Sequence, residues 1–188
     1  MVNMREFSPL NGLEGSRGIN FNIAEIRDAK ITVRGYMHNK DFVTAVEKVT
    51  GATLPTQPWS TEVGKSGITV LWLSPDEWMI RGKAGMQDSI IADLRKEFGD
   101  THACCVDVSD YYLTISLSGK NAVDVLQKGV VVDMHSDAFP IGYATGTRYE
   151  KATINLHKTG DDSYEVMIRQ SFAEYLWKHF VHGAKEFG

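Results

Sequence analysis

One stretch, Asp107–Gly129 (DVSDYYLTISLSGKNAVDVLQKG), combines a strand, a tight turn and a helix in a single run. Leu113, Ile115 and Leu117 alternate with polar residues, which is the period of a half-buried strand. Gly119 breaks this pattern, and the apolar residues that follow it fall at helical spacing. The stretch therefore predicts a strand–turn–helix unit.

The same unit occurs earlier in the chain. Ile31–Gly35 reads as a strand that ends in glycine, Asn39 can cap the next helix, and Gly51 is placed to close that helix. Further residues recur at offsets of 82 to 88 positions: Gly35 and Gly119, Pro55 and Pro140, Met79-Ile-Arg81 and Met167-Ile-Arg169, Leu94 and Leu176, Phe98 and Phe180. Offsets this uniform indicate an internal repeat.

Each repeat reads strand–helix–strand–strand–helix. We therefore predict an α+β protein of two similar halves, residues 19–103 and 104–188, each an antiparallel sheet with helices packed on one face. Residues 1–18 are polar and glycine-rich, and read as an irregular N-terminal arm. Alternation over Ile19–Ile26 predicts a strand, Asp28-Ala29 is predicted to form a turn, and Ser171-Phe-Ala-Glu174 predicts a capping box at the start of the last helix.

Composition limits the classes of function. The net charge of −4 and the absence of a basic run disfavour nucleic-acid binding. No apolar run approaches the roughly 20 residues of a membrane helix, and the N-terminus lacks the apolar centre of a secretory signal. The two cysteines, Cys104 and Cys105, are adjacent, which excludes a disulfide framework and favours a reducing, cytoplasmic location.

Motifs for catalysis or metal binding are weak. Asp107 and Asp110 could act as an acid–base pair, but residues of this kind more often form turns at the start of a strand. His179 and His182 could share a helix face, yet zinc would need two further ligands. We assign no catalytic, cofactor-binding or metal-binding residue to this chain. Arg148 and Arg169 are the candidates for an anion clamp, if a cleft between the halves binds a folate or an amino acid.

Longer motifs resemble a known family, the gamma subunit of heterotetrameric sarcosine oxidase. They cover nearly the whole chain and are most specific in its last 80 or so residues: SPL (8–10), LWLSPDEWMI (71–80), DVSD (107–110), LSGKNAVDVLQKG (117–129), AFPIG (138–142), TRYEKATINLHKTGDDSYEVMIRQSFAEYLWKHF (147–180) and EFG (186–188). A more distant resemblance, through DVS, a strand, Gly119 and Ala122, is to the aminomethyltransferase, or T-protein, of the glycine cleavage system.

The resemblance implies partners and cofactors. Members of this family accompany alpha, beta and delta subunits in an assembly that oxidatively demethylates sarcosine to glycine and passes the one-carbon unit to tetrahydrofolate. It implies that FAD, FMN, NAD and tetrahydrofolate are held by the other subunits, with zinc on the delta subunit. Residues Ala152–Gly160 (ATINLHKTG) lack the glycine pair and the aspartate that the aminomethyltransferases carry where they handle folate.

We therefore expect a non-catalytic subunit with an aminomethyltransferase-like fold, whose role is structural. The arm 1–18, the loop 130–143 and the aromatic C-terminal helix are the expected contact surfaces. The residues predicted to contact partner subunits are Phe7, Leu10, Phe139, Tyr175 and Trp177.

Overall fold

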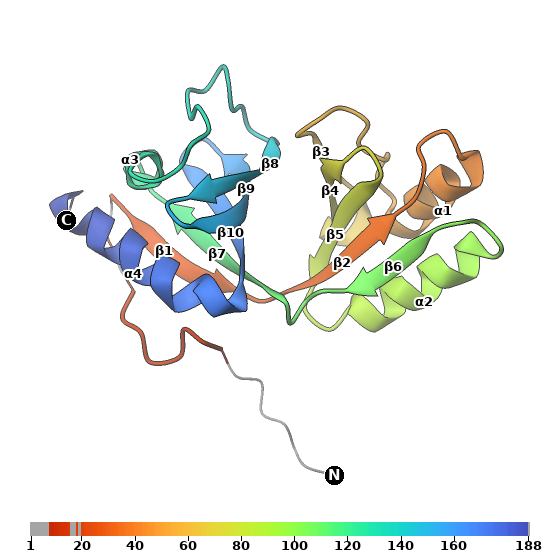
Figure 1. The fold of residues 1–188 in the computed structure, drawn as a ribbon, viewed down its shortest axis with the longest axis horizontal. Coiled ribbons are helices and arrows are strands. Elements are labelled where there is room, and N and C mark those ends of the chain that lie inside the picture. The colour runs from red at the N-terminus through yellow and green to blue at the C-terminus, as the bar shows by residue number, and fades with distance from the viewer. Residues whose placement is uncertain (1–7, 16–17, 19, 188) are drawn as a thin grey trace, which may run out of the picture.

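The protein consists of two five-stranded antiparallel sheets that face each other, with helices on the two outer flanks (Figure 1). The computed structural model describes residues 8–15, 18 and 20–187. We call the sheet with strand order β3-β4-β5-β2-β6 the N-sheet and the sheet with order β1-β7-β10-β9-β8 the C-sheet. Helices α1 and α2 cover the N-sheet, and α3 and α4 cover the C-sheet. The predicted fold class is confirmed.

The elements follow one another twice in the same order. In the first half they are β1 (Asn22–Ile26), β2 (Asp28–Arg34), α1 (Lys40–Thr50), β3 (Thr61–Val63), β4 (Thr69–Ser74), β5 (Glu77–Lys83) and α2 (Gln87–Phe98). In the second half they are β6 (Cys104–Asp107), β7 (Tyr112–Ser118), α3 (Ala122–Gln127), β8 (Ala144–Tyr149), β9 (Ala152–Gly160), β10 (Ser163–Arg169) and α4 (Ala173–Ala184).

The two halves exchange their first strands. β1 pairs with β7 in the C-sheet, from Asn22 opposite Ser118 to Ile26 opposite Thr114. β6 pairs in turn with β2 in the N-sheet. The boundary between residues 103 and 104 therefore divides the sequence repeats but not the sheets, because each half supplies one edge strand to the sheet of the other.

Local sequence explains where α1 begins and ends. The side chain of Asn39 accepts hydrogen bonds from the backbone N–H groups of Asp41 and Phe42, at 3.0 and 3.3 Å. Gly51 ends the helix in the left-handed conformation, with φ of 68°. Both predicted caps are confirmed.

Two local predictions are wrong. Ser171 and Glu174 form no capping box, because Gln170–Phe172 is a 3₁₀ turn and Phe172 takes the N-cap position without a side-chain hydrogen bond. Glu174 pairs instead with Lys178, one turn along α4. Asp28 is not part of a turn, since it is the first residue of β2.

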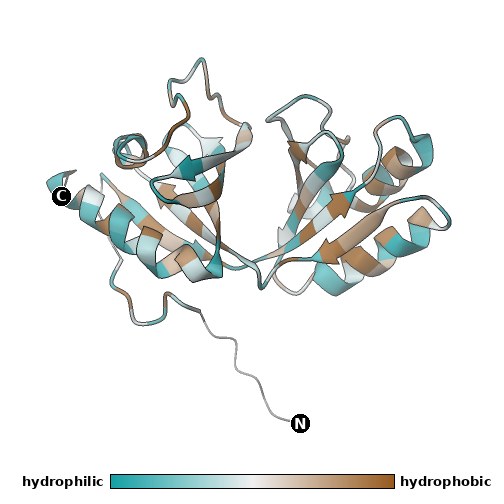
Figure 2. Ribbon diagram, in the orientation of Figure 1, coloured by the Kyte–Doolittle hydropathy of each residue, from teal (hydrophilic) through white to brown (hydrophobic). Residues whose placement is uncertain are grey.

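Three apolar clusters hold the layers together. One lies between the C-sheet and α3 and α4, and another lies between the N-sheet and α1 and α2. Figure 2 shows the hydrophobic residues concentrated on the strands and on helix surfaces that meet them. The third cluster is small and joins the two sheets through Leu71, Met79, Ala144 and Met167. Burial of this kind of surface is the main favourable term in folding.

Candidate functional site

The facing sides of the two sheets carry charged as well as apolar residues. Side chains alternate between the faces of a strand, so Met79 and Arg81 of β5 point toward the C-sheet, while Trp78 and Ile80 point toward the helices. In β10 the residue on the corresponding face is Glu165. The result is an ionic cluster beside the apolar inter-sheet contact.

The ionic cluster consists of Asp28, Lys30, Arg81 and Glu165. The Arg81 Nε donates to Asp28 Oδ2 at 2.6 Å, and the other end of its guanidinium pairs with Glu165 across the two sheets. Lys30 Nζ lies 2.5 Å from Asp28 Oδ1. The Thr114 hydroxyl donates to the same oxygen at 3.0 Å. Two cations and two anions thus neutralise one another, and Asp28 is their common partner.

Burial and ion pairing shift the pKa of each charged group of the cluster in opposite directions. Burial lowers the pKa of Lys30, and the attraction of Asp28 offsets this only in part. Burial would also lower the pKa of Arg81, but the charges of Asp28 and Glu165 outweigh it and raise that pKa. The cluster therefore holds Arg81 as a permanent cation.

Glu165 is the most strongly perturbed carboxyl group of the cluster. Burial alone would raise its pKa, but His157 and Arg81 outweigh burial and lower the pKa to about 2. His157 lies opposite Glu165 on β9, and its Nδ1 is 3.8 Å from the carboxylate, which is too long for a hydrogen bond. Arg81, which does hydrogen-bond the carboxylate, is therefore the partner that matters most.

This pKa predicts how stability depends on pH. The pKa of Glu165 falls from an ordinary value of 4.5 to about 2 on folding, so its contribution is complete above pH 4.5 and is lost as the pH falls toward 2. We expect it to contribute about 2 kcal/mol, after allowance for partial exposure. Urea unfolding at a series of pH values should show a smaller loss over this window in Glu165→Gln than in the unsubstituted protein.

A matched control is Glu97→Gln, which removes the partner of Lys48 in an exposed ion pair. We expect it to keep the acid-induced loss of the unsubstituted protein, because exposed pairs contribute little. An equal loss in Glu165→Gln and the unsubstituted protein would contradict the assignment.

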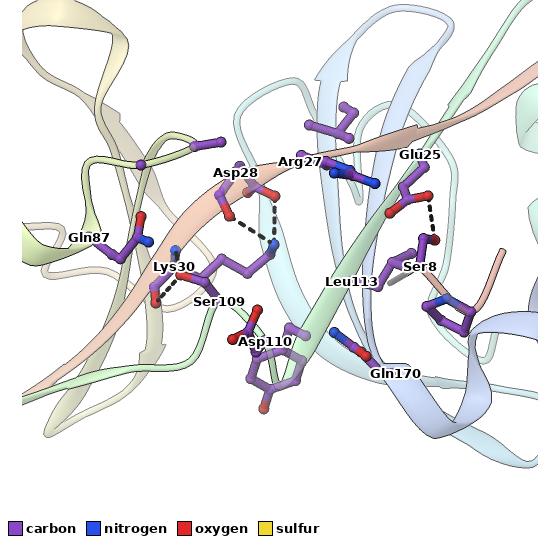
Figure 3. Close-up of a pocket in the computed structure, with 15 residues that line it drawn as sticks. Ser8, Glu25, Arg27, Asp28, Lys30, Gln87, Ser109, Asp110, Leu113 and Gln170 are labelled. Atoms are coloured by element: carbon purple, nitrogen blue, oxygen red, sulfur yellow. Dashed lines mark hydrogen bonds and ion pairs between the residues drawn. The ribbon is translucent and has the colours of Figure 1, made fainter. Parts of the chain in front are cut away.

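One pocket lies on the Lys30 side of the cluster (Figure 3). It has a volume of about 170 Å³. Figure 3 shows the Lys30 ammonium pointing to Asp28, with Ser109 and Gln87 nearby. The Ser109 hydroxyl accepts a hydrogen bond from the backbone N–H of Lys30 at 2.9 Å, and the buried Gln87 Oε1 has no hydrogen-bond partner among the residues that the structure describes. We call this cavity the Lys30 pocket.

A second, larger pocket lies on the other side of the same cluster. Its volume is about 380 Å³, and we call it the Arg81 pocket. Both sheets and the loop before β8 line it, and its lining includes Asp28, Val63, Arg81, Ile141, His157, Lys158 and Glu165. Asp28 lines both pockets, and residues of both halves of the chain line each of them.

The predicted anion clamp does not lie in either pocket. Arg148 is exposed on β8, and Arg169 is exposed at the end of β10, where its guanidinium lies 5.6 Å from the centre of the Tyr111 ring. Neither residue lines the Lys30 pocket or the Arg81 pocket. Arg81 and Lys30 are the cations that lie between the sheets instead. The sequence repeat matches Arg81 with Arg169, but the position of each residue on its strand decides whether its side chain faces inward.

The chain itself buries three of the residues predicted to contact partner subunits. Leu10 and Phe139 belong to the cluster between the C-sheet and its helices. Trp177 is in the same cluster, and its indole N–H donates to the carbonyl of Glu14 at 2.9 Å. These side chains are therefore not an exposed contact surface. Tyr175 is half-buried against His179, and Phe7 lies outside the described residues.

The weaker candidates resolve into structural roles. The Asp107 carboxylate accepts from the Ser109 backbone N–H and hydroxyl, at 2.9 and 2.6 Å, which is the turn expected at a strand start. Cys105 is buried, and Cys104 is exposed.

Among the residues that the structure describes, no group of three or more His, Cys, Asp or Glu could hold a metal ion. In that same part of the chain, no helix is long and apolar enough to span a membrane.

The ionic cluster is not predicted by the sequence patterns described above. Its residues come from β2, β5 and β10, and no local pattern links them. One signal was present: a charged residue stands on the polar face of each of these apolar strands, at Lys30, Arg81 and Glu165. Charged residues on two facing sheets must be paired when they are buried.

The fold places the chain in a known structural class. The aminomethyltransferase T of the glycine cleavage system from Bartonella henselae superposes with a TM-score of 0.65 at 12% identity, over 86% of this chain and 45% of that one. A chain of the heterotetrameric sarcosine oxidase from Corynebacterium sp. U-96 superposes with a TM-score of 0.84 at 24% identity, covering 92% of this chain and 88% of that one. The chain thus has an aminomethyltransferase-like fold.

Sequence comparison narrows this class to one family. The model of the sarcosine oxidase, gamma subunit family matches residues 34–186. The sarcosine oxidase subunit gamma of Corynebacterium sp. (strain P-1) is 30% identical over 175 residues, which is 93% of this chain and 85% of that protein. The chain belongs to the sarcosine oxidase gamma subunit family, and the resemblance noted in the sequence is confirmed.

Proposed function

We propose that this chain is a non-catalytic subunit of a heterotetrameric sarcosine oxidase that fixes the geometry of larger subunits. The observation that carries the proposal is the family match over residues 34–186, joined to a fold that resembles a chain of such an assembly over most of its length. The partners are the alpha, beta and delta subunits. Those subunits hold the flavins, NAD and tetrahydrofolate.

The inter-sheet site supports a structural role. The charged groups of Asp28, Lys30, Arg81 and Glu165 are each paired with another member of the cluster. A nucleophile or a general base needs a group that is free to exchange a proton with a substrate. Charges that bind one another across two sheets are better suited to fixing the position of those sheets.

Co-purification is the direct test of the proposal. A tagged chain is expressed together with its alpha, beta and delta partners and recovered through the tag. We expect a complex with flavin absorbance that produces peroxide when sarcosine is added. A colourless chain that elutes alone under these conditions would contradict the proposal.

Tyr175 is the predicted contact residue that the described fold leaves partly accessible on α4. We expect Tyr175→Ala to weaken co-purification by about tenfold or more, because tyrosine is enriched among the residues that dominate binding energy. The control is Tyr111→Ala, which removes an exposed tyrosine from the turn just before β7. Equal recovery of both variants would remove Tyr175 from the interface.

A further inference from the structure

Glu165 keeps one oxygen of its carboxylate available in the Arg81 pocket. Its Oε2 binds Arg81 across the two sheets, whereas Oε1 is not enclosed and has no hydrogen-bond or ion-pair partner among the described residues. The side chain is 20% exposed and lines this pocket. Although burial opposes it, pairing with His157 and Arg81 lowers the pKa of this carboxyl group to about 2, so it is an anion at neutral pH. The wall of the pocket thus contains a charged acceptor.

The imidazole of His157 provides a second acceptor beside the first. His157 stands opposite Glu165 on β9, and its enclosed Nδ1 lies 3.8 Å from the Glu165 carboxylate. A carboxylate on this side of the ring favours the tautomer that carries its proton on Nδ1. The lone pair then lies on Nε2, which is not enclosed and binds no other group in the described part of the chain. A ligand in this pocket therefore meets two neighbouring acceptors.

The charges that line the Arg81 pocket favour a cation. Asp28 and Glu165 supply two negative charges, and Arg81 supplies one positive charge. Lys30, which makes the whole cluster neutral, lines the Lys30 pocket and not this one. A cation that contacts Glu165 Oε1 has a negative charge as its nearest neighbour, and Coulomb attraction is strongest for the nearest charge.

Lys158 does not bring its charge into the pocket, although it is part of the lining. It alternates with His157 along β9 and stands opposite Tyr164, so its side chain lies on the face toward α3 and α4. Its ammonium group is 5.9 Å from the centre of the Tyr164 ring, which belongs to the cluster between the C-sheet and its helices. Lys158 therefore does not cancel the negative charge that the pocket offers.

The remaining walls and the size of the pocket restrict the ligand further. Val63 and Ile141 are 70% and 53% exposed and line the pocket, one from each half of the chain. They offer apolar contact to a ligand. The volume of about 380 Å³ is in the range of pockets that bind small molecules, at roughly 300–1,000 Å³.

We propose that the Arg81 pocket binds a small alkylammonium ion, whose N–H groups donate to Glu165 Oε1 and His157 Nε2. Its alkyl group lies against Val63 and Ile141. An ammonium group has donors and no acceptor, which matches a wall that offers two acceptors. An amino acid fits less well, because its own carboxylate would be repelled by the carboxylates of the pocket. This site is separate from the subunit role.

Nuclear magnetic resonance titration of the isotope-labelled full chain at neutral pH tests the proposal. The probes are isobutylamine, which is protonated under these conditions, uncharged isobutanol, and tetramethylammonium, a cation without N–H groups. Isobutylamine is expected to shift the carboxyl carbon signal of Glu165, the imidazole nitrogen signals of His157 and the backbone amides of Val63 and Ile141. The other two probes are each expected to bind at least about tenfold more weakly, since hydrogen bonds to charged groups are the stronger ones.

Two variants link the binding to the two acceptors. Glu165→Gln removes the charge and keeps the shape of the side chain, and it is expected to weaken isobutylamine binding by about tenfold or more. His157→Phe removes the second acceptor and is expected to weaken binding by a smaller factor. Glu97→Gln is the matched control, because it removes a carboxylate from an ion pair on α2 outside the pocket, and it should bind as the unsubstituted chain does.

Val63→Ser tests the apolar contact without changing the ionic cluster. Val63 is largely exposed, so the fold should tolerate the substitution. The variant is expected to bind isobutylamine about threefold or more weakly, because the alkyl group loses apolar contact. Binding of methylamine, which has too small an alkyl group to use this contact, should not change.

Each alternative outcome has a defined meaning. If isobutylamine shifts none of these signals in the unsubstituted chain, the proposal is overturned, even if Glu165→Gln fails to fold. Equal affinity for isobutanol would show that charge plays no part, and equal affinity for tetramethylammonium would show that the N–H groups play none; either result overturns the assignment. None of these results bears on co-purification, so the site and the subunit role can fail separately.

Discussion

Arg81→Met is expected to lower the free energy of unfolding by about 3–5 kcal/mol at neutral pH. The substitution keeps the apolar stem but leaves Asp28 and Glu165 facing each other between the sheets with one cation fewer. An unpaired buried charge costs far more than the pair itself contributes. Urea or thermal unfolding of the purified chain measures the loss.

Two further variants test this explanation. Arg34→Met breaks an ion pair with Glu77 in which the arginine side chain is 54% exposed, and it should cost at most about 1 kcal/mol. Adding Glu165→Gln to Arg81→Met removes one unpaired carboxylate, so the double variant should regain part of the lost stability. If Arg81→Met cost no more than Arg34→Met, the cluster would not be a structural centre.

Gly119→Ala is expected to destabilise the protein by roughly 3 kcal/mol or more. Gly119 has a φ of 108°, a conformation that residues with a Cβ rarely adopt. A Cβ there would also lie 2.6 Å from the backbone carbonyl oxygen of Asn20, just before the exchanged strand β1. The methyl group would therefore push β1 away from the end of β7, and unfolding measurements should detect this directly.

Gly85→Ala separates the two causes. Gly85 also has a positive φ, of 89°, but a Cβ there meets nothing within 4 Å. This variant should lose only the conformational part, about 1–2 kcal/mol. A loss at Gly119 equal to that at Gly85 would mean that the contact with Asn20 relaxes freely.

Local patterns were sufficient for much of the fold. The alternation in Leu113–Leu117 and the Asn39 cap predicted a strand and a helix, and both occur as expected. These signals depend only on residues that are close together in the chain, so they can be read completely from the sequence. The capping box that does not form shows where local prediction fails. Ser171 and Glu174 have the right spacing, but a 3₁₀ turn precedes α4 and puts Phe172 at the N-cap position.

Features that depend on partners distant in the chain could not be predicted. Alternation predicts a strand over residues 19–26, but it does not show that β1 pairs with β7 instead of β2. The internal repeat equated Arg81 with Arg169, although one is buried between the sheets and the other is exposed. The ionic cluster forms only after both sheets are placed. The resemblance to a family supplied the function that these patterns could not.

The exchanged strands have a consequence for how the protein is made. While the chain emerges from the ribosome, the N-sheet cannot be completed before β6 is synthesised. In the same way, β1 has no pairing strand until β7 is synthesised, because Asn22 pairs with Ser118. Neither sheet can be completed when only the first half has been synthesised, and pairing across so long a loop is slow. The nascent chain therefore exposes unpaired strand edges, which favour aggregation until the second half has been synthesised. Folding should therefore finish as one late, cooperative step.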